Sequence, residues 1–172
     1  MEEYVILVDE QDTPIGLMEK QAAHVTPHLH RAFSIFIFNS KGELLMQQRA
    51  LSKYHSPGLW TNTCCSHPRA GETLEEATSR RLMEEMGMSC EMHEVFTFID
   101  KAPVGLGLIE HEFDHVWFGS SDEEPVINRD EVEAWKYMDL DDISADMKKH
   151  PESYTEWFKI SFDEIMKHRP TL

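Results

Sequence analysis

The chain has 172 residues, of which 41% are hydrophobic, so it is long enough to bury a core and of ordinary size for one domain over residues 1–172. Its 32 acidic and 16 basic residues give a formal net charge of −16, which opposes binding to nucleic-acid backbones and to anionic membranes. We therefore expect neither as a partner, and an anionic substrate would need a local cluster of cations.

The N-terminal segment has no basic region followed by an apolar run, and no apolar stretch approaches membrane-spanning length. The three cysteines, Cys64, Cys65 and Cys90, are odd in number and two are adjacent, which argues against a disulfide framework. Because free thiols are typical of a reducing compartment, we expect a cytoplasmic protein. The sequence indicates no oligomeric state.

The first half of the chain is predicted to be rich in β-strands. Residues 4–9 form a short apolar run, and residues 32–38 form a nearly continuous one, as in a buried strand. Residues 39–42 predict a turn, and residues 44–49 a returning strand. The two strands around this turn therefore read as a β-hairpin with Arg49 at its far end.

A predicted loop over residues 50–59 precedes the clearest helical pattern, at residues 73–87. Thr73 and Glu76 form a capping-box pattern, and Gly87 is typical of a helix end. Between these ends, side chains that can face a core recur at helical spacing: Leu74, Ala77, Thr78, Leu82 and Met86.

The second half mixes strands and helices. Residues 95–99 and 109–118 predict strands, which a flexible connection with two glycines at residues 103–107 separates. Residues 133–138 predict another strand, and residues 143–149 a helix. A stronger helix follows, with one face formed by Tyr154, Trp157, Phe158, Ser161, Phe162 and Ile165.

The segment of residues 60–68 carries the most informative chemistry. Cys65 and His67 lie two residues apart, just before the carboxylate-rich helix. A thiol that can transfer protons, an imidazole that can ligate a metal and acids on the next helix are three chemical functions within one loop and one element. This arrangement predicts an enzyme site.

The charged residues of the predicted helix allow two readings. Arg80 and Arg81 each precede an acid by four residues, so the charges alone are explained by a salt-bridged exposed face. The spacing from Glu72 through Arg80 and Arg81 to the pair at residues 84–85 and on to Gly87, however, resembles the Nudix box.

Two positions depart from the Nudix box. Ser66 stands where the pattern opens with glycine, and Arg81 replaces one of the acids with which Nudix hydrolases gather metal around a diphosphate. These departures are those of the type 1 isopentenyl-diphosphate delta-isomerases, which the chain resembles from about residue 4 to residue 157. Further matches, in order, lie at residues 19–24, 29–34, 48–53, 60–68 and 107–112.

The resemblance implies an α/β/α sandwich around a mixed β-sheet, with the C-terminal helix closing a pocket. It also implies isomerisation of isopentenyl diphosphate to dimethylallyl diphosphate, through a carbocation, in isoprenoid biosynthesis. The substrate would be a small isoprenoid diphosphate. Shifting a double bond in this way requires that one group add a proton to a carbon and that another group remove one. By resemblance these groups are Cys65 and Glu112, while Cys64 and Cys90 pack in the core.

Three histidines and two glutamates are the expected metal ligands by resemblance: His24, His30, His67, Glu110 and Glu112. The two glutamates alternate on a predicted strand and so project from the same face. Any of these histidines alone is more simply a surface or capped residue. Together they suit one divalent ion such as Zn²⁺, Mn²⁺ or Mg²⁺ in expanded coordination.

The local cation cluster that the net charge requires is Lys20, Arg49, Lys53 and Arg81, which the resemblance assigns to the substrate diphosphate. Glu85 resembles the acid that holds Mg²⁺ against that diphosphate, and its simpler role is an ion pair with Arg81. Trp157 is implied to cover the carbocation, although a tryptophan on an apolar helical face is more often part of the core.

Asp100 marks a departure, because the family commonly has a tyrosine there, close to the catalytic acid. A carboxylate would remove a hydrogen-bond donor and add negative charge beside Glu112, which would raise the proton affinity of both groups. Two alternatives therefore stay open. The chain is a Nudix hydrolase of a nucleoside or isoprenoid diphosphate, against which Arg81 speaks, or it is a catalytically impaired or silent relative.

Overall fold

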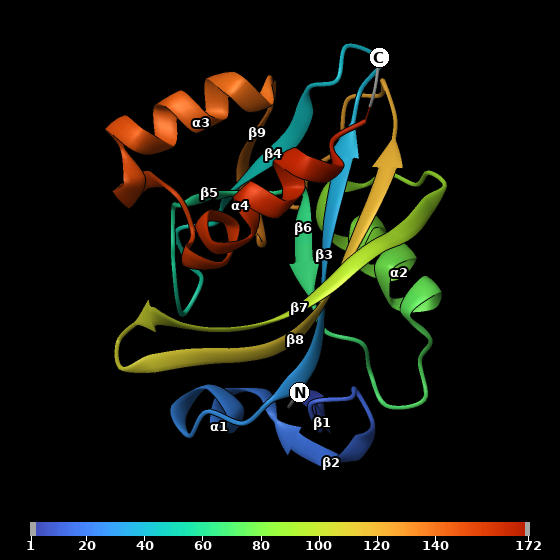
Figure 1. The fold of residues 1–172 in the computed structure, drawn as a ribbon, viewed down its shortest axis with the longest axis vertical. Helices are drawn as coiled ribbons and strands as arrows, with labels where there is room; N and C mark the ends of the chain where they lie inside the picture. The colour runs from blue at the N-terminus through green and yellow to red at the C-terminus, as the bar shows by residue number, and fades with distance from the viewer. Residues whose placement is uncertain (1–2, 171–172) are drawn as a thin grey trace.

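The computed structural model describes residues 3–170, in which one mixed β-sheet lies between helices (Figure 1). Within these residues, strands and helices follow one another as β1 (Tyr4–Val8), β2 (Pro14–Glu19), α1 (Lys20–Val25), β3 (His30–Phe38), β4 (Leu44–Arg49), β5 (Trp60–Thr61), β6 (Cys64–Ser66), α2 (Leu74–Met86), β7 (Met92–Gly105), β8 (Leu108–Ser120), β9 (Val132–Met138), α3 (Leu140–Lys149), a 3₁₀ turn (Pro151–Ser153) and α4 (Glu156–His168). No helix in this described part has the length and hydrophobicity to cross a membrane.

Strand β3 is the centre of the sheet. Strand β8 runs parallel to it along its whole length, and β7 pairs with the far side of β8. The other edge of β3 is shared in turn by β1 at its start, β6 in its middle and β4 at its end. As a result, β6 and β8 lie on either side of the same central strand (Figure 1).

The side chains of β3 alternate between two cores, as the period of a strand requires. Phe36 and Phe38 pack with α3 and α4, whereas Ile35 and Ile37 pack with α2. Figure 1 shows α3 and α4, in orange and red, on one side of the sheet and α2, in green, on the other. This arrangement confirms the predicted α/β/α sandwich around a mixed sheet.

The predicted hairpin of residues 32–49 is wrong in its pairing. Strands β3 and β4 meet only at Phe38 and Leu44, and β4 pairs along its length with β9 instead. Two fully buried polar side chains separate them: Asn62 donates to a β3 carbonyl at 2.9 Å, and the Thr63 hydroxyl accepts from a β3 amide at 2.9 Å and donates to a β4 carbonyl at 2.6 Å. Residues from later in the chain thus take the place of direct pairing.

The predicted flexible connection at residues 103–107 is also shorter than expected. Strand β7 continues to Gly105 and β8 begins at Leu108, so only Leu106 and Gly107 turn the chain. Both have positive φ, 55° and 73°, which is the conformation that a two-residue hairpin turn requires. The remaining predicted strands and helices are present with small shifts of their ends, while β2, α1, β5 and β6 are additional.

Helix α2 has the predicted ends. The Thr73 hydroxyl accepts from the Glu76 amide at 3.1 Å, and the Glu76 carboxylate accepts from the Thr73 amide at 3.0 Å, which completes the capping box. Gly87 ends the helix with φ 61°, and any larger residue there would collide with the Val126 carbonyl. Local signals therefore determine where this helix starts and stops.

Thr73→Ala is expected to lower the free energy of unfolding by about 1 kcal/mol, because the Glu76 amide at the helix start loses the hydroxyl to which it donates. Urea denaturation with an unchanged m value would measure the loss. Thr73→Ser keeps the hydroxyl and should stay near the parent stability. Equal midpoints for the Ala variant and the parent would show that the capping box contributes little.

Candidate active site

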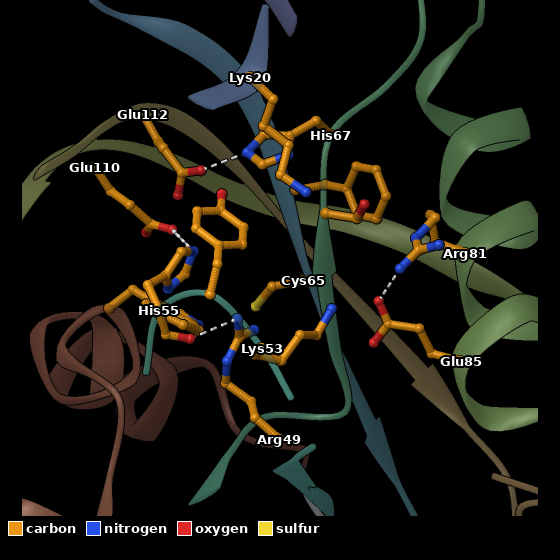
Figure 2. A pocket seen from close by; sticks show the side chains of 14 residues that line it. Lys20, Arg49, Lys53, His55, Cys65, His67, Arg81, Glu85, Glu110 and Glu112 are labelled. Carbon is orange, nitrogen blue, oxygen red and sulfur yellow. Dashed lines mark hydrogen bonds and ion pairs between the residues drawn. The ribbon is translucent and has the colours of Figure 1, made fainter. Parts of the chain in front are cut away.

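A cavity beside the central strand gathers most of the side chains that the sequence singled out (Figure 2). Those that line it are Lys20, Arg49, Lys53, Cys65, His67, Arg81, Glu85, Glu110, Glu112 and Trp157. His24 and His30 are fully buried behind this lining, and Asp100 is buried next to Glu110 and Glu112. The structure thus brings together residues from positions 20 to 157.

The strand order explains why a thiol and a carboxylate face one cavity. Cys65 on β6 is the neighbour of Ser34 on one edge of β3, and Glu112 on β8 is the neighbour of His30 on the other edge. Both side chains line the cavity, and Figure 2 shows them approaching it from different strands. The two groups can therefore act on one bound molecule from separate walls.

Hydrogen bonds hold the Cys65 side chain in place. Its Sγ donates to Asn62 Oδ1 at 3.0 Å and lies 3.4 Å from Ser34 Oγ, which donates to Asp114 at 2.7 Å. Burial raises the pKa of the Cys65 thiol well above its ordinary value, and the charge of Asp114 raises it further. Cys65 therefore carries a proton near neutral pH.

Two buried histidines present bare nitrogens to the glutamates. His24 Nδ1 donates to the Lys20 carbonyl at 2.7 Å, and His30 Nδ1 donates to the His28 carbonyl at 2.9 Å, which in the neutral form of each ring leaves the lone pair on Nε2. Neither Nε2 has a hydrogen-bond partner among the described residues, although they lie 3.5 Å and 3.3 Å from Glu110 and Glu112. Lone pairs facing carboxylate oxygens fit a divalent metal ion between them.

Three groups of three side chains in the described residues could hold a metal ion; one is Asp100, Glu110 and Glu112, and the other two contain the histidines. His30, His67 and Glu112 form one, and His67 Nε2 lies 2.8 Å from Glu112. His24 and Glu110 form the other together with His55, and within each group the ligand atoms lie within 4.8 Å of one another. His55 was not predicted from the sequence, because a histidine in a predicted loop two residues after Lys53 has no spacing that marks it as a metal ligand.

Burial and neighbouring charges set the protonation of these groups. Burial, with the charge of Glu112, raises the pKa of Glu110 to about 7. Burial would also raise the pKa of Glu112, but the facing imidazoles of His30 and His67 lower it well below its ordinary value. Burial lowers the pKa of His67 to about 4, so that imidazole stays neutral and free to ligate a metal.

The four predicted cations reach the same cavity from α1, β4, the following loop and α2. Arg49 lies over the Trp157 ring at 5.2 Å, and Lys20 lies 3.1 Å from Glu3. Lys53 and Arg81 both contact Glu131, a partner that the sequence analysis did not identify. Four cations of a strongly acidic chain are therefore gathered at one cavity, and three of them are paired with glutamates.

Known proteins resemble this chain in sequence over most of its length. The model of the NUDIX domain family matches residues 28–158. An isopentenyl-diphosphate Delta-isomerase 2 of Aromatoleum aromaticum is 51% identical over 98% of this chain and 89% of its own length, and an isopentenyl-diphosphate Delta-isomerase of Pectobacterium atrosepticum is 52% identical over 94% and 90%. The chain belongs to the isopentenyl-diphosphate Delta-isomerase family within the Nudix proteins.

Solved structures show that the fold extends beyond this isomerase family. DR0079 from Deinococcus radiodurans superposes with a TM-score of 0.78 over 98% of this chain and all of its own, at 22% identity. A MutT NUDIX hydrolase from Burkholderia pseudomallei gives 0.61 over 80% of this chain and 98% of its own, at 21% identity. At these identities the likeness concerns the fold alone.

The charged residues of helix α2 serve two purposes. Some form a salt-bridged surface and others line the cavity, so both predictions made from the sequence apply. Arg80 pairs with Glu72 at 2.7 Å and with Glu84 at 2.9 Å, outside the cavity lining. Arg81, one position on, pairs with Glu85, and both line the cavity. One side of the helix is thus a salt-bridged surface, while the adjacent side supplies an arginine and a carboxylate to the site.

Asp100 lies on β7 opposite Glu112 of β8. Burial raises its pKa to about 10, and the charges of Glu112, Asp114 and Glu110 add to the shift. The carboxyl group therefore stays neutral near pH 7 and keeps an O–H donor. The raised pKa of Asp100 agrees with the higher proton affinity expected from the sequence, whereas the pKa of Glu112, for which a rise was also expected, is lowered.

Asp100→Asn is expected to stabilise the metal-free protein at alkaline pH. The folded chain holds a proton on Asp100 where the unfolded chain, with its ordinary pKa of 3.8, has lost it, so this group reduces stability as pH rises toward about 10. Asparagine removes that dependence. In chelator-treated protein, the gain in unfolding free energy should be at least about 1 kcal/mol larger near pH 9 than near pH 5.

Asp163→Asn is the matched control, because Asp163 is exposed on α4. This change should alter the unfolding free energy little at either pH. Identical pH profiles of stability for the Asp100 variant and the parent would contradict a neutral Asp100.

Proposed function

We propose that this chain, as one domain, isomerises isopentenyl diphosphate to dimethylallyl diphosphate in isoprenoid biosynthesis. The observation that carries the proposal is one cavity with the Cys65 thiol, the Glu112 carboxylate and four cations in its lining. Relatives about half identical to the chain, each named isopentenyl-diphosphate Delta-isomerase, support the same reaction. The substrate is a small molecule, and the acidic net charge favours neither nucleic acid nor membrane as a partner.

The cations would bind the diphosphate. Arg49 and Arg81 offer planar forks that fit phosphate oxygens in pairs, and Lys20 and Lys53 add point charges. Glu85, next to Arg81 in the cavity, would hold a Mg²⁺ ion that accompanies the diphosphate. The charged end of the substrate would thereby be fixed, which places its five-carbon chain between the remaining walls.

The buried nitrogens and carboxylates would hold a divalent metal. The ligands proposed from the family resemblance are His24, His30, His67, Glu110 and Glu112, and Zn²⁺, Mn²⁺ and Mg²⁺ are the candidate ions. When bound, the ion would fix the orientation of Glu112 and stabilise its charged form.

Two proton-handling groups would carry the reaction. Cys65 and Glu112 would each exchange a proton with a different carbon of the substrate, one adding and the other removing. Trp157 of α4 lines the cavity, so its π-electrons would stabilise the intermediate cation without reacting with it. The largely buried walls would keep water away from that cation.

Product analysis tests the reaction. Protein with Mg²⁺ and isopentenyl diphosphate should form dimethylallyl diphosphate, measured by NMR, without release of phosphate. Inorganic phosphate or a monophosphate product would instead establish the Nudix hydrolase alternative. That alternative is disfavoured because Arg81 stands where Nudix hydrolases have an acidic residue. Substrate binding without turnover would establish a catalytically silent relative.

The proposal includes a cytoplasmic location. Cys64, Cys65 and Cys90 are all free thiols in the structure. Thiols persist in reducing compartments, and a mechanism that uses Cys65 requires that it stay reduced.

A further inference from the structure

His55 lies in the cavity as an additional imidazole beside the candidate metal ligands. It is 5% exposed, its ring centroid lies 5.5 Å from that of His24, and its Nε2 lies 3.5 Å from Glu110. His24 Nε2 lies at the same distance, 3.5 Å, from the same Glu110 oxygen. The carboxylate is therefore approached equally by two histidine nitrogens.

The Ser56 hydroxyl contacts the His55 ring and supports this orientation. Ser56 Oγ lies 3.5 Å from the Val104 carbonyl, to which it donates, and 3.3 Å from His55 Nδ1, from which it can accept. With its proton on Nδ1, His55 presents a bare Nε2, as His24 does. Ser56 itself has φ 49°, a left-handed conformation that is costly for a residue other than glycine and is typical of functional sites.

We propose that His55 is a ligand of a divalent transition-metal ion, binding through Nε2 together with His24 and Glu110. The ligand atoms of these three residues lie within 4.8 Å of one another, close enough for one ion to bridge them after small side-chain movements. Two imidazoles and a carboxylate are ligands that zinc, manganese and cobalt accept. This inference deepens the proposed function, because it enlarges the ligand set of the same site.

A simpler role for His55 would be packing against Trp157, whose ring it meets edge-on at 5.9 Å. Packing does not account for the position of Nε2, which lies beside the Glu110 carboxylate instead of apolar atoms. It also does not require the strained conformation of Ser56. The two roles differ in their effect on metal binding, which makes them separable.

Metal binding by the full-length chain tests the inference without substrate. Co²⁺ would be titrated in competition with a chelator into three metal-free proteins, the parent, His55→Gln and His55→Ala. The visible spectrum of the bound Co²⁺ would be recorded for each. Loss of one ligand should weaken Co²⁺ binding by at least about 10-fold and change that spectrum. Because no turnover is measured, the result is independent of whether the protein proves to be an isomerase.

His111→Gln is the matched control. His111 lies between Glu110 and Glu112 on β8, so its side chain projects from the opposite face of the strand, and this variant should bind Co²⁺ like the parent. Circular dichroism of the metal-free variants tests whether they are folded. Because two substitutions of His55 are made, one can still be measured if the other does not fold. Folded His55 variants with the parent affinity and the parent Co²⁺ spectrum would overturn the inference.

Discussion

Replacing Cys65 with alanine is expected to reduce kcat for isomerisation by about 10²- to 10⁴-fold, because one of the two proposed proton-handling groups is removed. Cys65 touches the cavity but makes only hydrogen bonds with Asn62 and Ser34, so its loss should leave the cation cluster in place. The KM for isopentenyl diphosphate should therefore change much less than kcat. Steady-state kinetics with saturating Mg²⁺ would separate the two effects.

The adjacent cysteine provides the control. Cys64 is fully buried in the core with α2 and does not line the cavity. Cys64→Ala should lower stability modestly while keeping kcat near that of the parent. Full activity of the Cys65 variant would exclude the thiol from the chemistry and would remove the main support for the isomerase mechanism.

Glu112→Gln is expected to have a comparable effect on kcat, again about 10²- to 10⁴-fold, for a different reason. An amide cannot accept a proton from carbon, and it also loses the charge that faces His30 and His67. Metal affinity should fall at the same time, because a neutral oxygen is a weaker ligand than a carboxylate. Activity must therefore be measured at rising metal concentration.

Two controls isolate the proton role of Glu112. Glu75→Gln, at an exposed position of α2, should retain the parent kcat and metal affinity. If activity of the Glu112 variant returned fully once the metal site was saturated, the residue would serve only as a ligand. A low kcat that persists at saturating metal would support its part in proton transfer.

Local features of the fold were predictable from the sequence, and pairing between distant segments was not. Thr73, Glu76 and Gly87 determine the ends of α2 through contacts within a few residues, so their pattern was sufficient. The hairpin prediction failed because Asn62 and Thr63 insert between β3 and β4 from later in the chain. The pattern of residues 32–49 alone gives no indication of that insertion.

The same distinction applies to the site. The residues matched by family motifs do gather in or beside one cavity, as their joint occurrence predicted. His55 was missed because its importance depends on the distance to Glu110, which lies far away in the sequence. The raised pKa of Asp100 was expected from its acidic neighbour, whereas the lowered pKa of Glu112 was not, because it depends on His30 and His67, whose proximity no residue type shows.

The central position of β3 has a consequence for redesign. A slip of this strand by one residue would exchange the phenylalanines and isoleucines between the two cores, and it would also move His30 away from Glu112 and Ser34 away from Cys65. Catalytic alignment and core packing are thus inseparable here. New substrate preferences should be sought in the loop of residues 50–59 and in α4, which contribute walls to the cavity without carrying the alignment of the sheet.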